Sequence, residues 1–315
     1  MFDDRRSGKF VLVLAAGSGN RLASLTTTTA GVRVPKQYCA LFGGRSLLGD
    51  AIARAELLAA RENIVVVVAR DHARWWEREF EGSVVRVVVQ PSDKGTAAGV
   101  LLGLRAIASV DERAHVTMLP ADHFVADEGA LAASLLAAQA TGRADRPVLL
   151  GMSADSPDPE YGYVVPVRST TPMLGVSQFV EKPTASDASA LLARGAVWNT
   201  MMLASPLSAL HALYERRLPR MLAAFRWARP EEGPSRAASL YSTIETADFS
   251  RDVLQGSEPF LDLRVAAPCG WTDLGTPSRV RACVLRYRSR YVAASCLRPA
   301  AVDLAAAAEA QTASA

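Results

Sequence analysis

A glycine-rich loop after a short apolar run is the segment of this chain whose residue types best suit chemistry. The apolar run Phe10–Leu14 leads into residues 17–21, Gly-Ser-Gly-Asn-Arg, and Lys36 follows further along the chain. Glycines let backbone N–H groups turn toward an anion without a side-chain clash, and Arg21 and Lys36 add positive charge. The loop therefore indicates a binding site for nucleotide phosphates.

Two common phosphate-binding loops do not fit this segment. The dinucleotide pattern needs Gly or Ala three residues after the second glycine, where this chain has Leu22, and the Gly-Lys-Ser/Thr of a Walker loop is missing. An ordinary strand-to-helix turn is the alternative, and Arg21 and Lys36 count against it. A compact ammonium retained in an arginine-rich chain also favours a functional site. Only four of the 35 basic residues are lysines: Lys9, Lys36, Lys94 and Lys182.

Two aspartates that each follow a predicted strand are candidate metal ligands. Asp122 lies in the sequence Pro-Ala-Asp-His at 120–123, and Asp273 lies in Trp-Thr-Asp-Leu-Gly at 271–275. Carboxylates beside a phosphate site suit Mg²⁺, which takes one or two protein carboxylates together with phosphate oxygens. A turn or cap role is the alternative for each aspartate. We expect the neighbouring His123 to be structural.

Polar motifs in the second half each have a structural alternative as well. Glu181 and Lys182 precede Pro183, which ends a strand, so they form either a site at the sheet rim or a solvated ion pair. Gly162 marks either the close approach of a ligand or a turn. Asn199 either binds a sugar hydroxyl or supports the core.

The sequence shows no Ser-His-Asp or Cys-His arrangement that would indicate an enzyme nucleophile. This fits a reaction in which the substrate is the nucleophile. A phosphate monoester, with its second pKa near ~6, is mostly dianionic at neutral pH and needs no general base. It needs positive charge to offset its repulsion from a triphosphate.

The elements that would position these motifs alternate between strand and helix over the first 150 residues. This alternation predicts an α/β fold with a Rossmann-like, mostly parallel but mixed sheet flanked by helices. Ligands of such sheets bind at the carboxyl ends of the strands, where the glycine loop, Gln90-Pro91 and Asp122 all fall. The expected strands are Phe10–Leu14, Ile64–Val68, Val84–Val89, Val116–Leu119 and Val148–Leu150, and the expected helices are Leu47–Ala60, His72–Phe80, Thr96–Ser109 and Ala130–Gln139.

The pattern of the second half is less regular, and no Pro-, Ser- and Gly-rich linker separates it from the first. We therefore expect a single domain over residues 1–295, followed by an Ala-rich tail at 296–315. The expected strands are Tyr161–Val167, Gln178–Val180, Val197–Leu203 and Leu261–Ala266. The expected helices are Ser186–Arg194, Pro206–Tyr214, Arg220–Trp227, a stretch near Asp248–Leu254, and Pro277–Arg290.

The charge, the cysteine spacing and the apolar runs indicate which partners and which location to expect for this protein. The net charge of +3 is spread along the 315 residues, which speaks against nucleic acid as a partner. The four cysteines lack zinc or redox spacing, and they predict reduced thiols and a cytoplasmic location. No apolar run is long enough to span a membrane, and the first one leads directly into the glycine loop, which favours a core strand over an export signal.

Taken together, the motifs resemble the sugar-1-phosphate nucleotidyltransferase family, and most closely its mannose-1-phosphate guanylyltransferases. The resemblance covers roughly residues 9–290 and implies a nucleotide-binding half at about 9–150 and a sugar-binding half at about 151–290. It rests on seven motifs in the order of the family, at residues 14–22, 35–38, 120–123, 160–163, 179–183, 198–199 and 271–275. The guanylyltransferase likeness rests on residues 36–38, 90–97 and 120–123.

The resemblance implies a role for each matching residue. Arg21, Lys36 and Lys182 would be catalytic, Asp122 and Asp273 would carry Mg²⁺, and Gly162, Glu181, Lys182 and Asn199 would bind the sugar phosphate. The implied substrates are small molecules, an NTP and a hexose 1-phosphate, and a homodimer is left open. The implied nucleotide-binding residues are Ala15, Ala16, Gly17, Ser18, Gly19, Asn20, Arg21, Gln90, Pro91, Thr96 and Asp122.

Two departures bear on the substrate. After Asn199 the family often has Ser-Gly, whereas this chain has Thr200-Met201, and residues 26–29 are four threonines where relatives commonly carry charge. GTP with mannose 1-phosphate is the expected pair. UTP or dTTP with glucose 1-phosphate is the alternative within the same class. A non-catalytic regulatory protein that binds sugar nucleotides is the alternative from another class.

Overall fold

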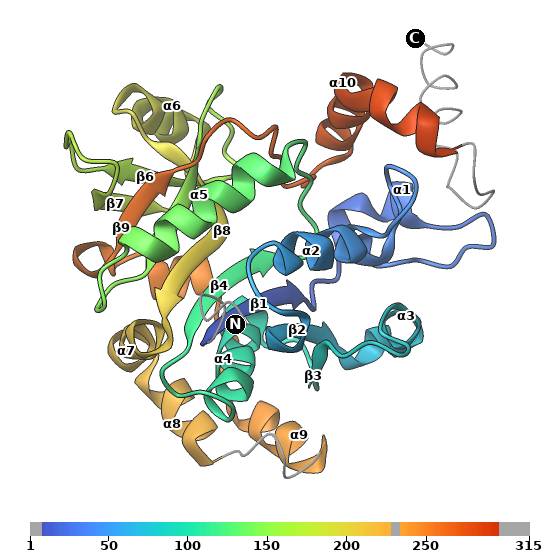
Figure 1. Cartoon of the computed structure of the whole chain (residues 1–315), viewed down its shortest axis with the longest axis horizontal. Coiled ribbons are helices and arrows are strands. Elements are labelled where there is room, and N and C mark those ends of the chain that lie inside the picture. The colour runs from blue at the N-terminus through green and yellow to red at the C-terminus, as the bar shows by residue number, and fades with distance from the viewer. Residues whose placement is uncertain (1–7, 228–233, 296–315) are drawn as a thin grey trace, which may run out of the picture.

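A single mixed sheet organises the part of the chain that the computed structural model describes, residues 8–227 and 234–295 (Figure 1). Its strand order is β3-β2-β1-β4-β8-β5-β9-β7-β6, so strands from both halves of the sequence share one hydrogen-bonded layer. The strands are β1 Lys9–Ala15, β2 Ile64–Ala69, β3 Arg86–Gln90, β4 His115–Pro120, β5 Val148–Ser153, β6 Gly162–Pro166, β7 Leu174–Val180, β8 Val197–Pro206 and β9 Asp262–Val265.

Parallel pairing dominates the first half of the sheet, and antiparallel pairing begins at β8. β1 runs parallel to both β2 and β4, and β2 runs parallel to β3. β8 is antiparallel to β4 and β5, whereas β5 and β9 are parallel. The sheet is therefore mixed, as the sequence predicts, and its parallel part brings the carboxyl ends of β1, β3 and β4 to one rim.

Helices cover both faces of the sheet. All the expected helices form, although their ends shift by a few residues, and α9 was not expected from the sequence. The segment near Asp248 is a π-helical turn, Phe249–Leu254. The helices are α1 Ala23–Thr26, α2 Leu47–Glu56, α3 Ala73–Glu79, α4 Gly95–Ala108, α5 Glu128–Thr141, α6 Ala185–Ala193, α7 Leu207–Arg217, α8 Pro219–Trp227, α9 Pro234–Thr243 and α10 Pro277–Ser295.

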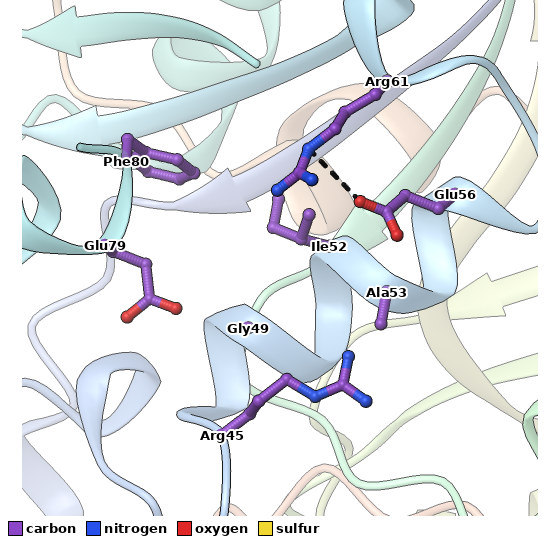
Figure 2. A pocket seen from close by; sticks show the side chains of 8 residues that line it. All are labelled: Arg45, Gly49, Ile52, Ala53, Glu56, Arg61, Glu79 and Phe80. Atoms are coloured by element: carbon purple, nitrogen blue, oxygen red, sulfur yellow. Dashed lines mark ion pairs between the residues drawn. The ribbon is translucent and has the colours of Figure 1, made fainter. Parts of the chain in front are cut away.

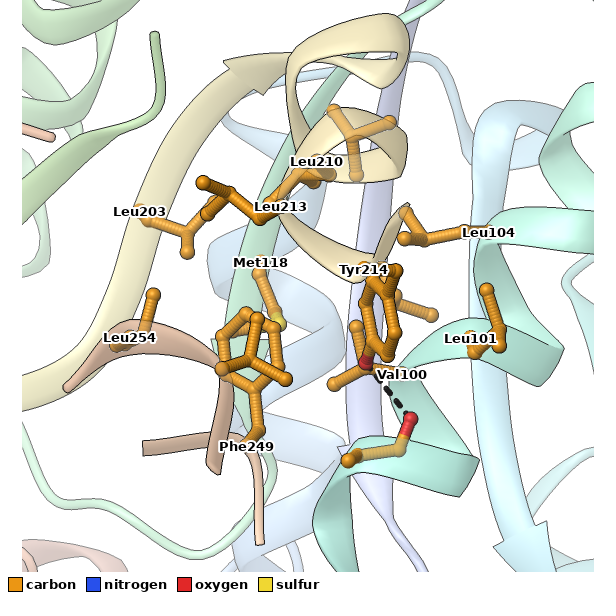
Figure 3. Close-up of a cluster of buried hydrophobic side chains, with 14 of the residues drawn as sticks. Val100, Leu101, Leu104, Met118, Leu203, Leu210, Leu213, Tyr214, Phe249 and Leu254 are labelled. Atoms are coloured by element: carbon orange, nitrogen blue, oxygen red, sulfur yellow. Dashed lines mark hydrogen bonds between the residues drawn. The ribbon is translucent and has the colours of Figure 1, made fainter. Parts of the chain in front are cut away.

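Alternate residues of β1 explain why both faces must be covered. Val11 and Val13 point into a core formed with α2 and α5, whereas Phe10 and Leu12 point into the core on the other face. That second core contains α4, α7 and the π-helical turn, and there the Tyr214 hydroxyl donates a hydrogen bond to the Ala97 carbonyl at 2.7 Å (Figure 3). The rigid sheet between the two cores holds the rim in place.

The last part of the chain returns to the first. α10 packs through Val280 and Cys283 against Leu22 and Leu47 near the glycine loop. The predicted tail, 296–315, lies outside the described residues, and the single-domain organisation stays a prediction. In the described residues, no helix combines the length and the apolar character that a membrane crossing requires.

Candidate active site

A cavity of about 630 Å³ opens at the carboxyl ends of β1, β3 and β4 and extends to β6 and β8. Both halves of the chain therefore line one cavity. Most of the residues singled out from the sequence lie on its wall: Ala15, Ala16, Gly17, Ser18, Arg21, Lys36, Gln90, Thr96, Asp122, Gly162, Glu181, Lys182, Asn199 and Asp273.

Three predicted nucleotide-binding residues lie off this wall. Gly19 has φ 62°, and a Cβ there would come within 2.9 Å of Lys36 Cβ, so a side chain at this position would clash with the lysine. Asn20 accepts a hydrogen bond from Arg33. Pro91 follows Gln90, which does line the cavity.

Lys36 lies at the centre of the polar wall, the part of the cavity wall that Lys36, Asp122 and Asp273 form. Its side chain is buried, and Nζ donates to the backbone carbonyls of Asp273 (2.6 Å) and Leu274 (3.1 Å) and lies 3.2 Å from Asp122 Oδ2. An ammonium has three N–H donors, so this arrangement uses all of them. Lys36 thereby joins the two aspartates that the sequence could not show to be neighbours.

Both aspartates are ionised at neutral pH. Desolvation alone would raise the pKa of each carboxyl. The Lys36 ammonium outweighs it at Asp122. At Asp273 it is outweighed by the His123 imidazolium that forms at low pH and by the Arg279 guanidinium, so both pKa values lie below the ordinary aspartate range. Burial lowers the pKa of His123 to about 4, and its Nδ1 accepts a hydrogen bond from Trp271 Nε1 at 3.1 Å. His123 is therefore a neutral buttress at neutral pH, in agreement with the structural role expected of it.

Asp122 and Asp273 are the candidate ligands for a hard divalent cation. Asp122 Oδ1 lies 3.9 Å from His123 Nε2, beyond hydrogen-bond distance, and 40% of the Asp122 side chain is exposed. No group of three or more His, Cys, Asp or Glu side chains in the described ranges could hold a metal by itself. A pair of carboxylates suits Mg²⁺, because this ion takes its remaining ligands from phosphate and water.

The wall that the second half of the chain contributes includes Gly162, Glu181 and Asn199. A Cβ at Gly162 would collide with the Glu181 carboxylate, so this glycine is required by packing. Glu181 Oε2 is buried and receives no hydrogen bond from the described residues. Burial, reinforced by Asp248, raises the pKa of Glu181 to about 7. Asn199 is held by Ser250, whose Oγ accepts from Nδ2 at 3.1 Å.

Strained backbone surrounds the cavity. Lys182, Met201 and Leu274 have φ of 48°, 58° and 51°, in the left-handed region that favours glycine. Met201 lines the cavity, as its place after Asn199 suggests, and lies where the pairing of β5 with β8 is irregular. Such strain concentrates at functional sites.

Several residues on or behind the wall were missed from the sequence. Arg279 pairs with Asp273 and Asp158, and Glu160 pairs with Arg21. Asp248 also lines the cavity and caps the π-helical turn, where its Oδ1 accepts from Arg251 N. Asp248 could have been found from the sequence, because it stands at the cap position of a predicted helical stretch. Arg279 could not, because nothing distinguishes it from the other arginines among the 31 in the chain.

A second, smaller hollow of about 250 Å³ lies between α2 and the end of α3 (Figure 2). Its walls carry charges of both signs, and Arg61 Nε pairs with Glu56 Oε1 at 3.3 Å. It contains none of the residues singled out from the sequence. The large cavity is therefore the candidate active site.

Comparison with known proteins places this geometry in context. The family model described as nucleotidyl transferase matches residues 10–288. The alginate biosynthesis protein AlgA of Pseudomonas syringae pv. tomato is 31% identical over 201 residues, which cover 61% of this chain and 40% of AlgA. ManC of Salmonella typhimurium, a mannose-1-phosphate guanylyltransferase, is 26% identical over 291 residues, or 86% of this chain and 58% of ManC. The chain thus spans only part of the length of these curated relatives.

Solved structures show the same fold. A Thermus thermophilus protein described as a mannose-1-phosphate geranyltransferase superposes with a TM-score of 0.72 and 25% identity, covering 85% of this chain and 76% of that one. A UDP-glucose pyrophosphorylase in complex with UDP-glucose superposes with a TM-score of 0.59 and 14% identity, covering 90% and 99%. At that identity the second likeness concerns the fold alone.

Proposed function

Because this chain belongs to the nucleotidyl transferase family, we propose that it transfers a nucleotidyl group from an NTP to a hexose 1-phosphate. In this reaction a phosphate oxygen of the sugar phosphate attacks the α-phosphorus of the NTP, the bond to the bridging oxygen breaks, and pyrophosphate leaves. The observation that carries the proposal is the shared cavity, whose wall includes the glycine loop, Lys36, Asp122 and Asp273 together with Glu181 and Asn199 of the other half.

The cavity wall supplies the positive charge that this reaction needs. Arg21 and Lys36 lie beside the loop, and Lys182 lies on the sugar side. Because the sugar phosphate is already dianionic, the residues need only offset charge repulsion and orient the two phosphates in line. Asp122 and Asp273 would hold Mg²⁺, which when bound neutralises phosphate charge.

The sugar side offers acceptors that match hydroxyl groups. Glu181 Oε2 is buried without a donor, so a sugar hydroxyl would satisfy it. Asn199 Oδ1 accepts from Met201 N at 3.2 Å, which fixes the amide in place. We therefore assign the sugar to the space between Gly162, Glu181 and Asn199.

GTP and mannose 1-phosphate are the proposed substrate pair. The name of ManC, which matches 86% of this chain, supports that choice. UTP or dTTP with glucose 1-phosphate is the alternative within the same class of reaction. A cytoplasmic location and a homodimer stay predictions from the sequence.

Pyrophosphate release tests the proposal. The purified full chain is incubated with Mg²⁺ and each of GTP, UTP, dTTP, CTP and ATP, crossed with mannose 1-phosphate and glucose 1-phosphate. Release confined to GTP with mannose 1-phosphate, and abolished by EDTA, is expected. Release with another pair would replace the substrates but keep the reaction. Silence across the panel from folded protein would favour the regulatory alternative.

Asp273→Asn is the matched variant for the metal assignment. We expect turnover to fall by about 10²–10³, because one preorganised charge in the site is lost while the shape is kept. Asp155→Asn, at an exposed position outside the cavity wall, serves as the control. Unchanged turnover in Asp273→Asn would remove this residue from the site.

A further inference from the structure

The Arg279 guanidinium binds the Asp273 carboxylate from behind the cavity wall. Its Nη1 donates to both Asp273 oxygens, at 2.8 Å to Oδ1 and 3.0 Å to Oδ2, and its Nη2 pairs with Asp158. The guanidinium carbon lies 3.9 Å from the centre of the Tyr161 ring. We call these contacts of Arg279 with Asp273, Asp158 and Tyr161 the Arg279 clamp. Only 13% of the Arg279 side chain is exposed, so the clamp is well shielded from water.

The two oxygens of Asp273 are not equivalent. Oδ1 accepts from Arg279 Nη1, from the Tyr161 hydroxyl at 3.1 Å and from Gly275 N at 2.9 Å. Oδ2 accepts from Arg279 alone among the hydrogen bonds of the described residues. A carboxylate oxygen has two lone pairs, so Oδ1 is saturated and Oδ2 retains an open acceptor direction.

Arg279 nearly balances the charge of the ion-pair cluster to which it belongs. Within this cluster Lys36 and Arg279 are the cations, and Asp122, Asp158 and Asp273 are the anions. Removing the guanidinium leaves three carboxylates facing one ammonium. A free divalent cation would then be attracted more strongly.

We propose that Arg279 is a positioning residue that acts through Asp273: its charge keeps the affinity of the nucleotide-free enzyme for divalent cations low. The cation then binds tightly only when nucleotide phosphates contribute their own negative charge. This inference rests on the proposed function only in taking Asp273 as a metal ligand.

Mn²⁺ titration of the nucleotide-free full chain, read by the electron paramagnetic resonance signal of free Mn²⁺, tests the proposal. Arg279→Met removes the charge and keeps much of the length, and we expect its Kd for Mn²⁺ to fall about tenfold. Arg279→Lys keeps the charge and should stay near the parent. Arg286→Met, an exposed position on the same helix, is the matched control.

The outcomes separate a positioning role from a merely structural one. If Arg279 only supported the fold, its loss would weaken Mn²⁺ binding or leave it unchanged, and either result, including no binding by any variant, would overturn the proposal. Tighter binding by Arg279→Met that Asp122→Asn or Asp273→Asn abolishes would support it. Because the titration needs no turnover, such a result would stand even if every pair in the pyrophosphate panel failed.

Discussion

At the scale of single residues, charged side chains of the cavity are already engaged with one another. Arg21 of the glycine loop pairs with Glu160, which belongs to the other half of the chain. Both side chains are about half exposed, at 53% and 46%. In the proposed reaction an incoming triphosphate would therefore compete with Glu160 for the Arg21 guanidinium.

Glu160→Gln should ease this competition. An exposed ion pair contributes about 0.2–1 kcal/mol, so we expect KM for the NTP to fall by up to about fivefold, with kcat nearly unchanged. Steady-state kinetics at low ionic strength would measure the effect, and Glu62→Gln removes the same charge from an exposed site outside the cavity wall. A rise in KM would show instead that Glu160 holds Arg21 in its working position.

The pKa of Glu181 gives a second prediction at this scale. The folded-state pKa, about 7, lies above the value of 4.5 for an unperturbed glutamate, so the folded state binds the extra proton between these values. The contribution of Glu181 to stability is therefore fully present below pH 4.5 and is lost as the pH rises toward 7. Glu181→Gln mimics the protonated form and avoids that loss.

We expect Glu181→Gln to raise Tm by a few degrees at pH 8 and to leave it nearly unchanged at pH 5. Thermal unfolding followed by circular dichroism at both pH values measures the difference. Glu245→Gln, at an exposed position, should show no such pH dependence. An equal shift at both pH values would contradict the assigned cause.

At the scale of elements, β8 carries the feature that departs most from a regular strand. Met201 adopts φ 58° in the interior of β8 and still packs partly against the core. A non-glycine residue in this region costs about 1–2 kcal/mol. The left-handed backbone that places Met201 at the cavity therefore lowers the stability of the strand.

A comparison of Met201→Gly with Met201→Ala isolates that strain. Both variants lose the side-chain packing, but only glycine relieves the left-handed backbone, so Met201→Gly should be more stable than Met201→Ala by about 1 kcal/mol. Urea unfolding measures the two values. The usual order, with alanine more stable than glycine, would show that this backbone is unstrained.

Regular elements were predictable and local irregularities were not. β1 and β2 are continuous Val-rich runs buried on both faces, and this pattern fixes their type and direction. Four of the ten residues of α9 are Ser or Thr, which are weaker helix formers than Ala or Leu, so its composition gave little indication of a helix. The distorted backbone at Met201 depends on pairing with β5, which no local pattern encodes.

The same contrast holds for the candidate site. Lys36, Asp122 and Asp273 could be singled out because each lies in a short, recognisable motif. Their contact through Lys36 Nζ could not, because residues 36 and 273 meet only when the sheet is complete. The clamp by Arg279 is likewise a product of tertiary packing.

At the scale of the whole molecule, one sheet joins the two halves of the cavity. β8 pairs with β4 of the first half and with β5 and β6, so loop and sugar wall are held by the same hydrogen-bonded layer. A ligand that binds to one side of the cavity therefore need not order the residues on the other side.

Hydrogen exchange measured by mass spectrometry should show this division. With Mg²⁺, the NTP should slow exchange in residues 14–22, mannose 1-phosphate in residues 161–163 and 199–202, and the nucleotide sugar in both sets. At a ligand concentration about 100-fold above Kd, local openings that release the ligand should slow by up to about 100-fold. Protection of both sets by the NTP alone would show that the halves are coupled.

Hydrogen bonds join Lys36 to the carbonyls of Asp273 and Leu274, which follow it in the chain by 237 and 238 residues. A ribosome that has already made the glycine loop and every strand through β8 has still not made the groups that hold this ammonium. Thr272, which bridges to Phe124, is also added late. The nascent protein thus carries its glycine loop with one wall of the cavity missing until residues 272–274 have been made.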